Sequence, residues 1–178
     1  MKNDEKLAKY KEAVGYIAKN QINHFFGNKG ANHAEIVLEN LISNSNDIIR
    51  IFTGGLNGEV SNSQSFKNAL EAFFNKPDTK LFLLHTKNAV MDTIGANLIK
   101  QKADELKGRI KLKEITDEFI EEIHKILDVG EFFTLGDDDK VRIETEPEKL
   151  EAIVNFNNKT IVKVLTKAFD NEFNKQNN

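Results

Sequence analysis

Three side chains in the segment HTKNAVMD have types that suit catalysis. His85, Lys87 and Asp92 follow the spacing H-x-K-x4-D. An imidazole titrates near neutral pH, an ammonium group carries a positive charge, and a carboxylate can orient either of them. Three fixed positions are few, however, so a match of this kind also arises by chance.

Two other pairs of polar side chains suit binding. Arg142 and Glu144 alternate with apolar residues, so both lie on one face of a predicted strand, as an ion pair within the sheet or as part of a ligand site. Asn155 and Asn157 likewise share a face. Asn is a poor strand former, and two at alternate positions indicate a polar pocket or an interface.

A polar cleft near the strand ends would bring Thr53, Asn57, Asn155 and Asn157 together, because α/β sheets often bind ligands there. Thr53 and Asn57 follow a predicted strand, and Asp137 opens an acidic turn that is too short for a calcium cage. We expect neither a metal site nor a cofactor. The candidate binding residues are Thr53, Asn57, Asp137, Arg142, Glu144, Asn155 and Asn157.

The composition indicates one globular domain. Of 178 residues, 39% are hydrophobic and 30% are charged, which is enough for a buried core. The formal net charge of −3 gives no global positive field for nucleic-acid binding. No apolar run approaches the roughly 20 residues that span a bilayer, and cysteine is absent. We therefore expect a cytoplasmic protein without a membrane partner.

Apolar periodicity predicts the elements that must position these side chains. Helices are expected over residues 5–26, 31–42, 66–74, 90–106, 117–127 and 160–173. Strands are expected over residues 48–53, 80–86, 109–115, 131–135, 141–145 and 152–157. Ser65 and Asp92 are predicted to cap the helices that follow them.

The order of these elements predicts an α/β fold. Early strands that alternate with helices favour parallel pairing, and later consecutive strands favour antiparallel pairing. We expect a mixed sheet of about six strands with helices on both faces. The expected organisation is an N-terminal helix and connector over 1–30, one compact unit over 31–174 and a frayed tail over 175–178.

This element order resembles one half of the phospholipase D superfamily. The resemblance covers residues 34–173 and is carried by HAEIVLENLI, by IRIFTGGL, and by FFTLGDDDKVRIE followed by AIVNFNN. In catalytic members of that superfamily, a His attacks phosphorus, a Lys holds the phosphoryl oxygens and an Asp supports the site. Their H-x-K lies on a strand that enters a tight turn, the turn supplies the Asp, and a Gly-Ser-x-Asn segment follows on a later strand.

The resemblance implies a degenerate catalytic site. When Asp137 or its neighbour is aligned with the Asp of that turn, Gly130 or Glu131 takes the position of the His, and Phe132 or Phe133 that of the Lys. A phenyl ring cannot hold phosphoryl charge, and neither Gly nor Glu replaces a nucleophile with a pKa near neutrality. The final segment NFNN also lacks the Gly-Ser.

Three functional hypotheses follow. The first is a non-catalytic phospholipase D-like interaction or regulatory module of a bacterial nucleic-acid or defence-related system. The resemblance implies a homodimer for it, and it leaves a protein partner and nucleic acid open. The second is a metal-independent phosphodiesterase or nuclease in which His85 is the nucleophile, Lys87 contacts phosphate and Asp92 supports the site. The third is a small-ligand or phosphate-binding module.

Overall fold

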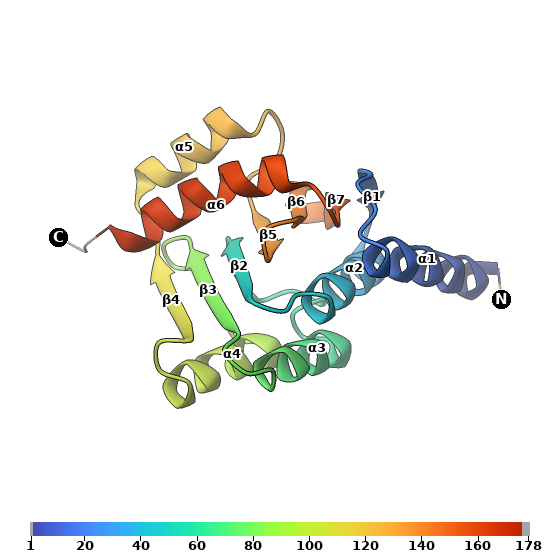
Figure 1. The fold of residues 1–178 in the computed structure, drawn as a ribbon, viewed down its shortest axis with the longest axis horizontal. Helices are drawn as coiled ribbons and strands as arrows, with labels where there is room; N and C mark the ends of the chain where they lie inside the picture. Colours follow the sequence, from blue (N-terminus) through green and yellow to red (C-terminus); the bar gives the residue numbers. More distant parts are fainter. Residues whose placement is uncertain (1, 176–178) are drawn as a thin grey trace.

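The fold is built on one mixed sheet of seven strands, in the order β1-β7-β6-β5-β2-β3-β4 (Figure 1). The computed structural model describes residues 2–175. The strands are β1 (Phe26–Asn28), β2 (Ile48–Thr53), β3 (Lys80–His85), β4 (Ile110–Glu114), β5 (Phe133–Gly136), β6 (Lys140–Glu146) and β7 (Glu151–Asn155). The helices are α1 (Lys2–Lys19), α2 (Ala31–Ser43), α3 (Gln64–Phe74), α4 (Ile94–Glu105), α5 (Asp117–Ile126), the 3-10 turn η1 (Pro147–Lys149) and α6 (Lys159–Asn174).

The direction of the strands decides which residues meet. Strands β2, β3 and β4 are parallel, whereas β5, β6, β7 and β1 each pair antiparallel with their neighbours. The carboxyl ends of β2, β3 and β6 therefore share one edge of the sheet with the starts of β5 and β7. The ends of β5 and β7 lie at the opposite edge. These two edges are named the β2-end edge and the β2-start edge below.

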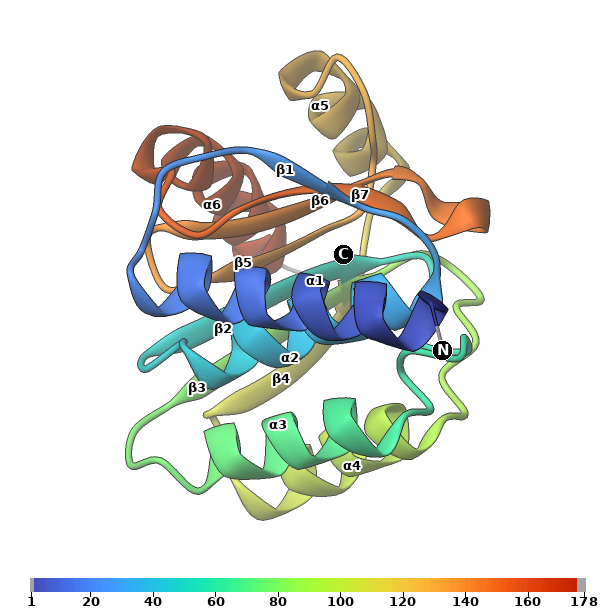
Figure 2. The same cartoon turned by 90° about the vertical axis from the view of Figure 1, so that its right-hand side faces the viewer.

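Helices cover both faces of the sheet, as expected for this α/β fold. Apolar residues of α1 to α4 pack on the face that carries Ile51 and Val154, and those of α5 and α6 pack on the face that carries Phe52 and Phe133. Figure 2 shows the two helical layers on either side of the sheet. Alternate residues of each strand enter opposite cores, so the central strands are buried on both faces.

The first helix ends earlier than its periodicity predicts. Helix α1 stops at Lys19, Gln21 has a positive φ of 48°, and β1 follows where the sequence predicts only helix and connector. The chain is held here by β7, because Phe26 pairs with Val154 in an antiparallel register. The short strand β1 is the seventh strand of the sheet, one more than predicted.

Two predicted helix caps are also wrong by one or two residues. Ser63, not Ser65, accepts the hydrogen bond from Phe66 N that caps α3. Thr93 caps α4 by accepting from Ala96 N, so Asp92 lies in the loop before the helix. A Thr or Ser hydroxyl serves this role as well as a carboxylate does.

Helix α5 is capped from a distant element. Its N-cap residue Thr116 makes no side-chain cap of its own. The fully buried carboxylate of Glu172 on α6 accepts hydrogen bonds from Thr116 N at 2.6 Å and from Thr116 Oγ1 at 3.3 Å. An anionic acceptor at a helix N-terminus is favoured by the free N–H groups and the helix dipole. Glu172 therefore joins the two helices of this layer.

Residues 2–175 contain no helix that is both long and apolar enough to cross a membrane. The tail expected at 175–178 lies, apart from Lys175, outside the described residues.

Candidate functional site

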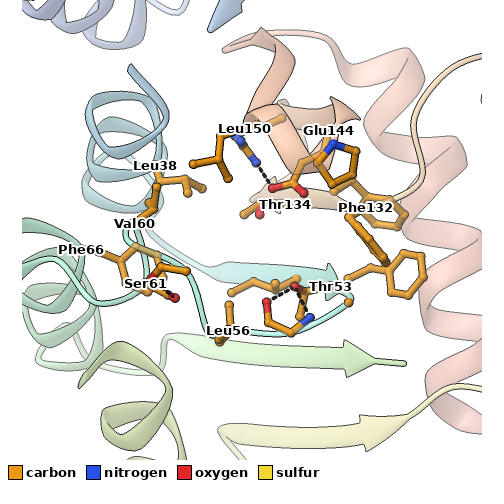
Figure 3. A pocket seen from close by; sticks show the side chains of 18 of the residues that line it. Leu38, Thr53, Leu56, Val60, Ser61, Phe66, Phe132, Thr134, Glu144 and Leu150 are labelled. Atoms are coloured by element: carbon orange, nitrogen blue, oxygen red, sulfur yellow. Dashed lines mark hydrogen bonds and ion pairs between the residues drawn. The ribbon is translucent and has the colours of Figure 1, made fainter. Parts of the chain in front are cut away.

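A cavity of about 250 Å³ lies at the β2-end edge, between the sheet and the loop that follows β2 (Figure 3). Its polar lining comprises Thr53, Asn57, Ser61, Thr134, Arg142 and Glu144. Its apolar lining includes Leu38, Leu56, Val60, Phe66, Phe132 and Leu150. A concave, mostly apolar site with a few polar groups is the usual form of a small-molecule site.

Strand register brings the deeper polar groups of the cavity together. Arg142 pairs with Thr134 across β5 and β6, and Thr134 pairs with Ile51 of β2. Arg142 and Glu144 are two residues apart on β6 and so share a face, as the sequence predicts. That face looks toward α2 and the loop after β2.

Arg142 and Glu144 form an ion pair inside the cavity. Arg142 Nη1 donates to Glu144 Oε1 at 2.5 Å, and the Arg142 side chain is only 2% exposed. Arg142 Nε also donates to Asn28 Oδ1 at 3.2 Å, and Asn28 Nδ2 donates to the backbone oxygen of Leu150 at 2.8 Å. The buried guanidinium thus has a charged partner and a neutral one, which offsets its desolvation.

Three polar atoms of this cluster are left without a partner among residues 2–175. They are Nη2 of Arg142, the second carboxylate oxygen of Glu144 and the hydroxyl of Thr134. Every fully buried side-chain nitrogen or oxygen in the described residues has a hydrogen-bond partner. The three free atoms must therefore be accessible, and the surface they line is the cavity. Figure 3 shows Glu144 and Thr134 reaching toward it.

The loop after β2 is held tightly. The hydroxyl of Thr53 donates to Gly55 O at 2.7 Å and accepts from Gly55 N at 3.1 Å. Leu56 N donates to Val90 O at 2.9 Å, and Thr93 Oγ1 donates to Leu56 O at 3.0 Å. Thr53 therefore shapes the wall of the cavity with a hydroxyl that is already engaged.

The aromatic wall of the cavity contains Phe132, which the alignment above equates with the Lys of catalytic phospholipases D. Gly130, equated with the His, has φ +90°, and a Cβ there would lie 2.5 Å from Glu144 O. This close approach of two backbones restricts the position to glycine.

The H-x-K-x4-D residues lie outside this cavity. His85 ends β3 beside Thr53, and its Nδ1 lies 3.0 Å from Thr86 O. Lys87 and Asp92 are exposed in the loop between β3 and α4. Within residues 2–175, no hydrogen bond or ion pair connects any two of these three side chains.

Asp137 lies at the β2-start edge, in the turn between β5 and β6. Its carboxylate accepts hydrogen bonds from the backbone N–H groups of Asn46, Asp47 and Ile48 at 2.9–3.2 Å, and Lys140 Nζ lies 3.1 Å away. Burial alone would raise the pKa of Asp137, but these donors and the Lys140 charge outweigh it and hold the pKa below its ordinary value. Asp137 thus fastens the turn to the start of β2.

Asn155 and Asn157 also lie at the β2-start edge, where they hold the segment after α1. Asn155 Nδ2 donates to Asn23 Oδ1 at 2.9 Å, and Asn157 Nδ2 donates to Gln21 O at 2.8 Å. Of the seven candidate binding residues, the structure thus brings Thr53, Asn57, Arg142 and Glu144 to one cavity. The other three candidates lie at the far end of the strands. The described residues contain no cluster of three or more His, Asp or Glu side chains that could hold a metal ion.

Ser61, Phe66 and Thr134 are lining residues that sequence reasoning missed. All four residues of β5 are buried, so no contrast between a buried and an exposed face of the strand could have singled out Thr134. Ser61 and Phe66 reach the cavity because the loop after β2 folds back over the sheet.

Solved structures of low sequence identity share this fold. TrmBL2, an archaeal chromatin protein described as showing a novel mode of DNA binding, has 13% identity and a TM-score of 0.56, covering 97% of this chain and 62% of that one. Nuc, a phospholipase D family member from Salmonella typhimurium, has 8% identity and a TM-score of 0.53, covering 85% and 95%. Phosphatidylserine synthase from Haemophilus influenzae has 11% identity and a TM-score of 0.53, covering 85% and 38%.

This chain therefore spans less than two thirds of the chromatin protein and of the synthase. No protein-family model matches the sequence, and no curated protein matches it. The similarity to Nuc and to the synthase confirms that the fold is phospholipase D-like.

Proposed function

We propose that the chain is a non-catalytic phospholipase D-like module that binds a small ligand in the cavity at the β2-end edge and acts through that binding as an interaction or regulatory module. The observation that carries the proposal is the set of unpaired polar atoms on Arg142, Glu144 and Thr134 within a mostly apolar cavity. Unpaired donors and acceptors that face a cavity can each form a hydrogen bond with a bound ligand.

The arrangement of the H-x-K-x4-D residues supports a role without catalysis. Phosphoryl transfer needs a nucleophile and a cationic group that converge on the same phosphorus atom. His85 is engaged with the backbone next to it, and Lys87 and Asp92 are exposed in a loop. Among the residues that line the cavity in the described chain, Arg142 and Glu144 are the ionisable ones.

Hydrolysis assays test the absence of catalysis. The native chain and His85→Ala are compared on single-stranded DNA, double-stranded DNA and bis(4-nitrophenyl) phosphate, with and without EDTA. We expect no hydrolysis by either protein. Activity that resists EDTA and disappears in His85→Ala would contradict the proposal and support the alternative of a metal-independent phosphodiesterase at His85, Lys87 and Asp92.

Amide chemical shifts test the binding site. A ligand in the cavity should shift the amides of Thr53, Thr134 and Glu144, which line it, and leave that of Asp137 at the opposite edge unchanged. A ligand that shifts Asp137 and spares Thr134 would place binding elsewhere and contradict this site.

The resemblance leads us to propose a homodimer, because superfamily members with one half-domain commonly pair. We further place the module in the cytoplasm of a bacterium, in a nucleic-acid or defence-related system. A mass measurement in solution at tens of micromolar tests the homodimer, and finding only monomer would refute it.

Nucleic-acid contact through α6 is a second candidate function. Lys159, Lys163 and Lys167 recur every four residues on α6 and line one groove. The other charged residues of the groove are Arg50, which is paired with Asp170, and the carboxylates Asp47, Asp137 and Asp138. Lys163 and Lys167 are exposed and form no ion pair within residues 2–175. Lysines in such a row can contact successive phosphates, and each contact makes binding weaker at high salt.

Fluorescence anisotropy with labelled DNA at several salt concentrations tests this second function. The variant Lys163→Glu/Lys167→Glu should weaken binding and flatten its salt dependence, because it removes two phosphate contacts. Lys19→Glu/Lys107→Glu, which reverses two exposed lysines outside α6, is the charge-matched control and should change binding little. An equal loss in both variants would mean that only the net charge matters.

A further inference from the structure

We infer that the cavity selects an uncharged ring compound whose edge presents a hydrogen-bond donor next to an acceptor, as the base of a nucleoside or the hydroxyl pair of a monosaccharide does. This inference rests on the proposed function, because it names the ligand class of the same cavity. Charge balance, free hydrogen-bonding atoms and the shape of the walls each support it.

The charges inside the cavity already cancel. Arg142 and Glu144 neutralise each other at 2.5 Å, and the other lining residues in the described chain carry no ionisable side chain. A phosphate or carboxylate group would place a second negative charge beside Glu144, and a cation would face Arg142. Either ligand would leave an uncompensated charge next to the buried guanidinium and its partner, which is unfavourable. An uncharged ligand avoids this cost.

The free atoms define the edge that the ligand must present. Nη2 of Arg142 can only donate, and the free oxygen of Glu144 can only accept. These two groups are neighbours because the same two side chains are bonded to each other. The hydroxyl of Thr134, across the strand pair from Arg142, can donate or accept. The best partner is therefore a ligand with an N–H or O–H group directly beside an oxygen or nitrogen acceptor.

The remaining walls suit the flat or apolar faces of a ring. Phe66 and Phe132 lie on opposite sides of the cavity, and Leu56 and Leu150 contribute aliphatic surface (Figure 3). Aromatic walls of this kind pack well against a heterocycle or the C–H face of a sugar. A volume of about 250 Å³ admits one such ring system and excludes an oligonucleotide.

Titration calorimetry together with amide chemical shifts tests the inference on the full chain. The probes are guanosine, uridine, glucose, the 5′-monophosphates of both nucleosides, and inorganic phosphate. We expect at least one uncharged probe to bind with shifts at Thr134 and Glu144. If that probe is a nucleoside, adding a 5′-phosphate should raise its affinity by no more than about twofold, because the cavity has no unpaired cation for the phosphate.

Two isosteric variants link binding to the free atoms. Glu144→Gln replaces the free acceptor with a possible donor and should lower the affinity for the bound probe about tenfold or more. Thr134→Val removes only a hydroxyl and should weaken it about threefold to tenfold, which keeps the test valid if Glu144→Gln folds poorly. Glu131→Gln, a carboxamide change next to Phe132 but outside the lining, is the matched control and should stay within about twofold.

The outcomes distinguish a base from a hydroxyl pair as the ligand. They also distinguish failure of this inference from failure of the proposed function. Binding of only one of the two nucleosides, without glucose, identifies a base edge, because both carry the same ribose. Binding of glucose, or of both nucleosides equally, identifies a hydroxyl pair. Binding in the cavity that requires a phosphate group overturns the inference but leaves the proposed ligand site standing. No binding by any probe, or binding that Glu144→Gln and Thr134→Val leave unchanged, also overturns the inference. Hydrolysis dependent on His85 overturns the non-catalytic function instead.

Discussion

The ring of Phe132 lies directly against Gly54, so that a Cβ at Gly54 would come within 2.7 Å of the ring atom Cζ. Gly54 starts the loop after β2, and Phe132 precedes β5, so the contact joins two walls of the cavity. Phe132 also packs edge-on against Phe52, with ring centroids 5.3 Å apart. The ring therefore cannot move without disturbing the core beneath it.

Gly54→Ala should consequently disturb the cavity. The added methyl group forces the Phe132 ring to shift, and we expect a loss of about 1–3 kcal/mol in the free energy of unfolding together with weaker ligand binding. Urea unfolding and calorimetry measure the two effects. Gly58→Ala in the same loop is the control, since a Cβ there meets nothing within 4 Å. Similar losses in both variants would mean that the loop simply needs glycine.

Asp137 should make the free energy of unfolding depend on pH in the acidic range. Burial opposes its charge, but the backbone N–H groups and Lys140 hold its folded pKa below the unfolded value of about 3.9. Its contribution to stability is thus present above about pH 4 and is lost as the pH falls through the folded pKa. We expect Asp137→Asn to lower the free energy of unfolding at pH 7 by about 1–3 kcal/mol and to flatten this acid dependence.

Asp138→Asn is the matched control for that measurement. The Asp138 side chain is 78% exposed and lies 3.6 Å from Lys159, which is 68% exposed, so its loss should change stability by less than about 0.5 kcal/mol. The free energy of unfolding of each variant and of the native chain is measured by urea unfolding at several pH values between about 3 and 7. Identical acid slopes for both variants would argue against the role of Asp137.

Glu172→Ala should loosen the layer of α5 and α6. The change removes the acceptor for Thr116 N and a partner at 2.6 Å for Lys175, and it leaves a cavity where a fully buried side chain was. We expect a loss of about 2–3 kcal/mol and faster hydrogen exchange of the Thr116 amide. Glu121→Ala on the exposed side of α5 serves for comparison. Unchanged exchange at Thr116 would show that the cap is not formed in solution.

Tyr10 should titrate at unusually high pH. Burial raises its pKa to about 12, while the positive charge of Arg142 acts in the opposite direction. In Tyr16→Phe, Tyr10 is the only tyrosine, so its phenolate absorbance can be followed alone. We expect a midpoint near pH 12 while circular dichroism shows the chain still folded. Stability linked to Tyr10 is present below pH of about 10 and is lost as the pH rises through the folded pKa.

Arg142→Met adds a second readout to the tyrosine titration. Since Arg142 lowers the pKa of Tyr10, its removal should move the phenolate midpoint further upward. A midpoint that stays where it was, in a folded variant, would mean that the guanidinium does not lie near Tyr10.

The order of helices and strands was predictable because most of their apolar residues recur with a clear period. Strand β1 was not, since three residues carry no period and their pairing with β7 depends on a segment more than one hundred residues later, Phe26 meeting Val154. The end of α1 was missed for the same reason. Asn155 and Asn157 hold the turn and the irregular segment after Lys19, and local helix propensity cannot reveal contacts with residues so distant in the sequence.

The candidate site was predicted in part. Arg142 and Glu144 were found because alternation on one strand places both on the same face. Asn155 and Asn157 were expected in one cleft with Thr53 and Asn57, but β7 runs antiparallel to β2 and its end lies at the other edge of the sheet. Strand direction depends on the order of strands in the sheet, which a single sequence does not contain. The free hydroxyl of Thr134 likewise emerged only from the register with Arg142.

Asn28 connects the cavity to the edge strand β1. Its amide oxygen accepts from Arg142 and its amide nitrogen donates to Leu150, so one side chain of β1 bonds to two residues that line the cavity. Helix α1 precedes this strand, with residues 20–25 between them. The guanidinium that faces the cavity is therefore bonded to the same short strand that joins the first helix to the sheet.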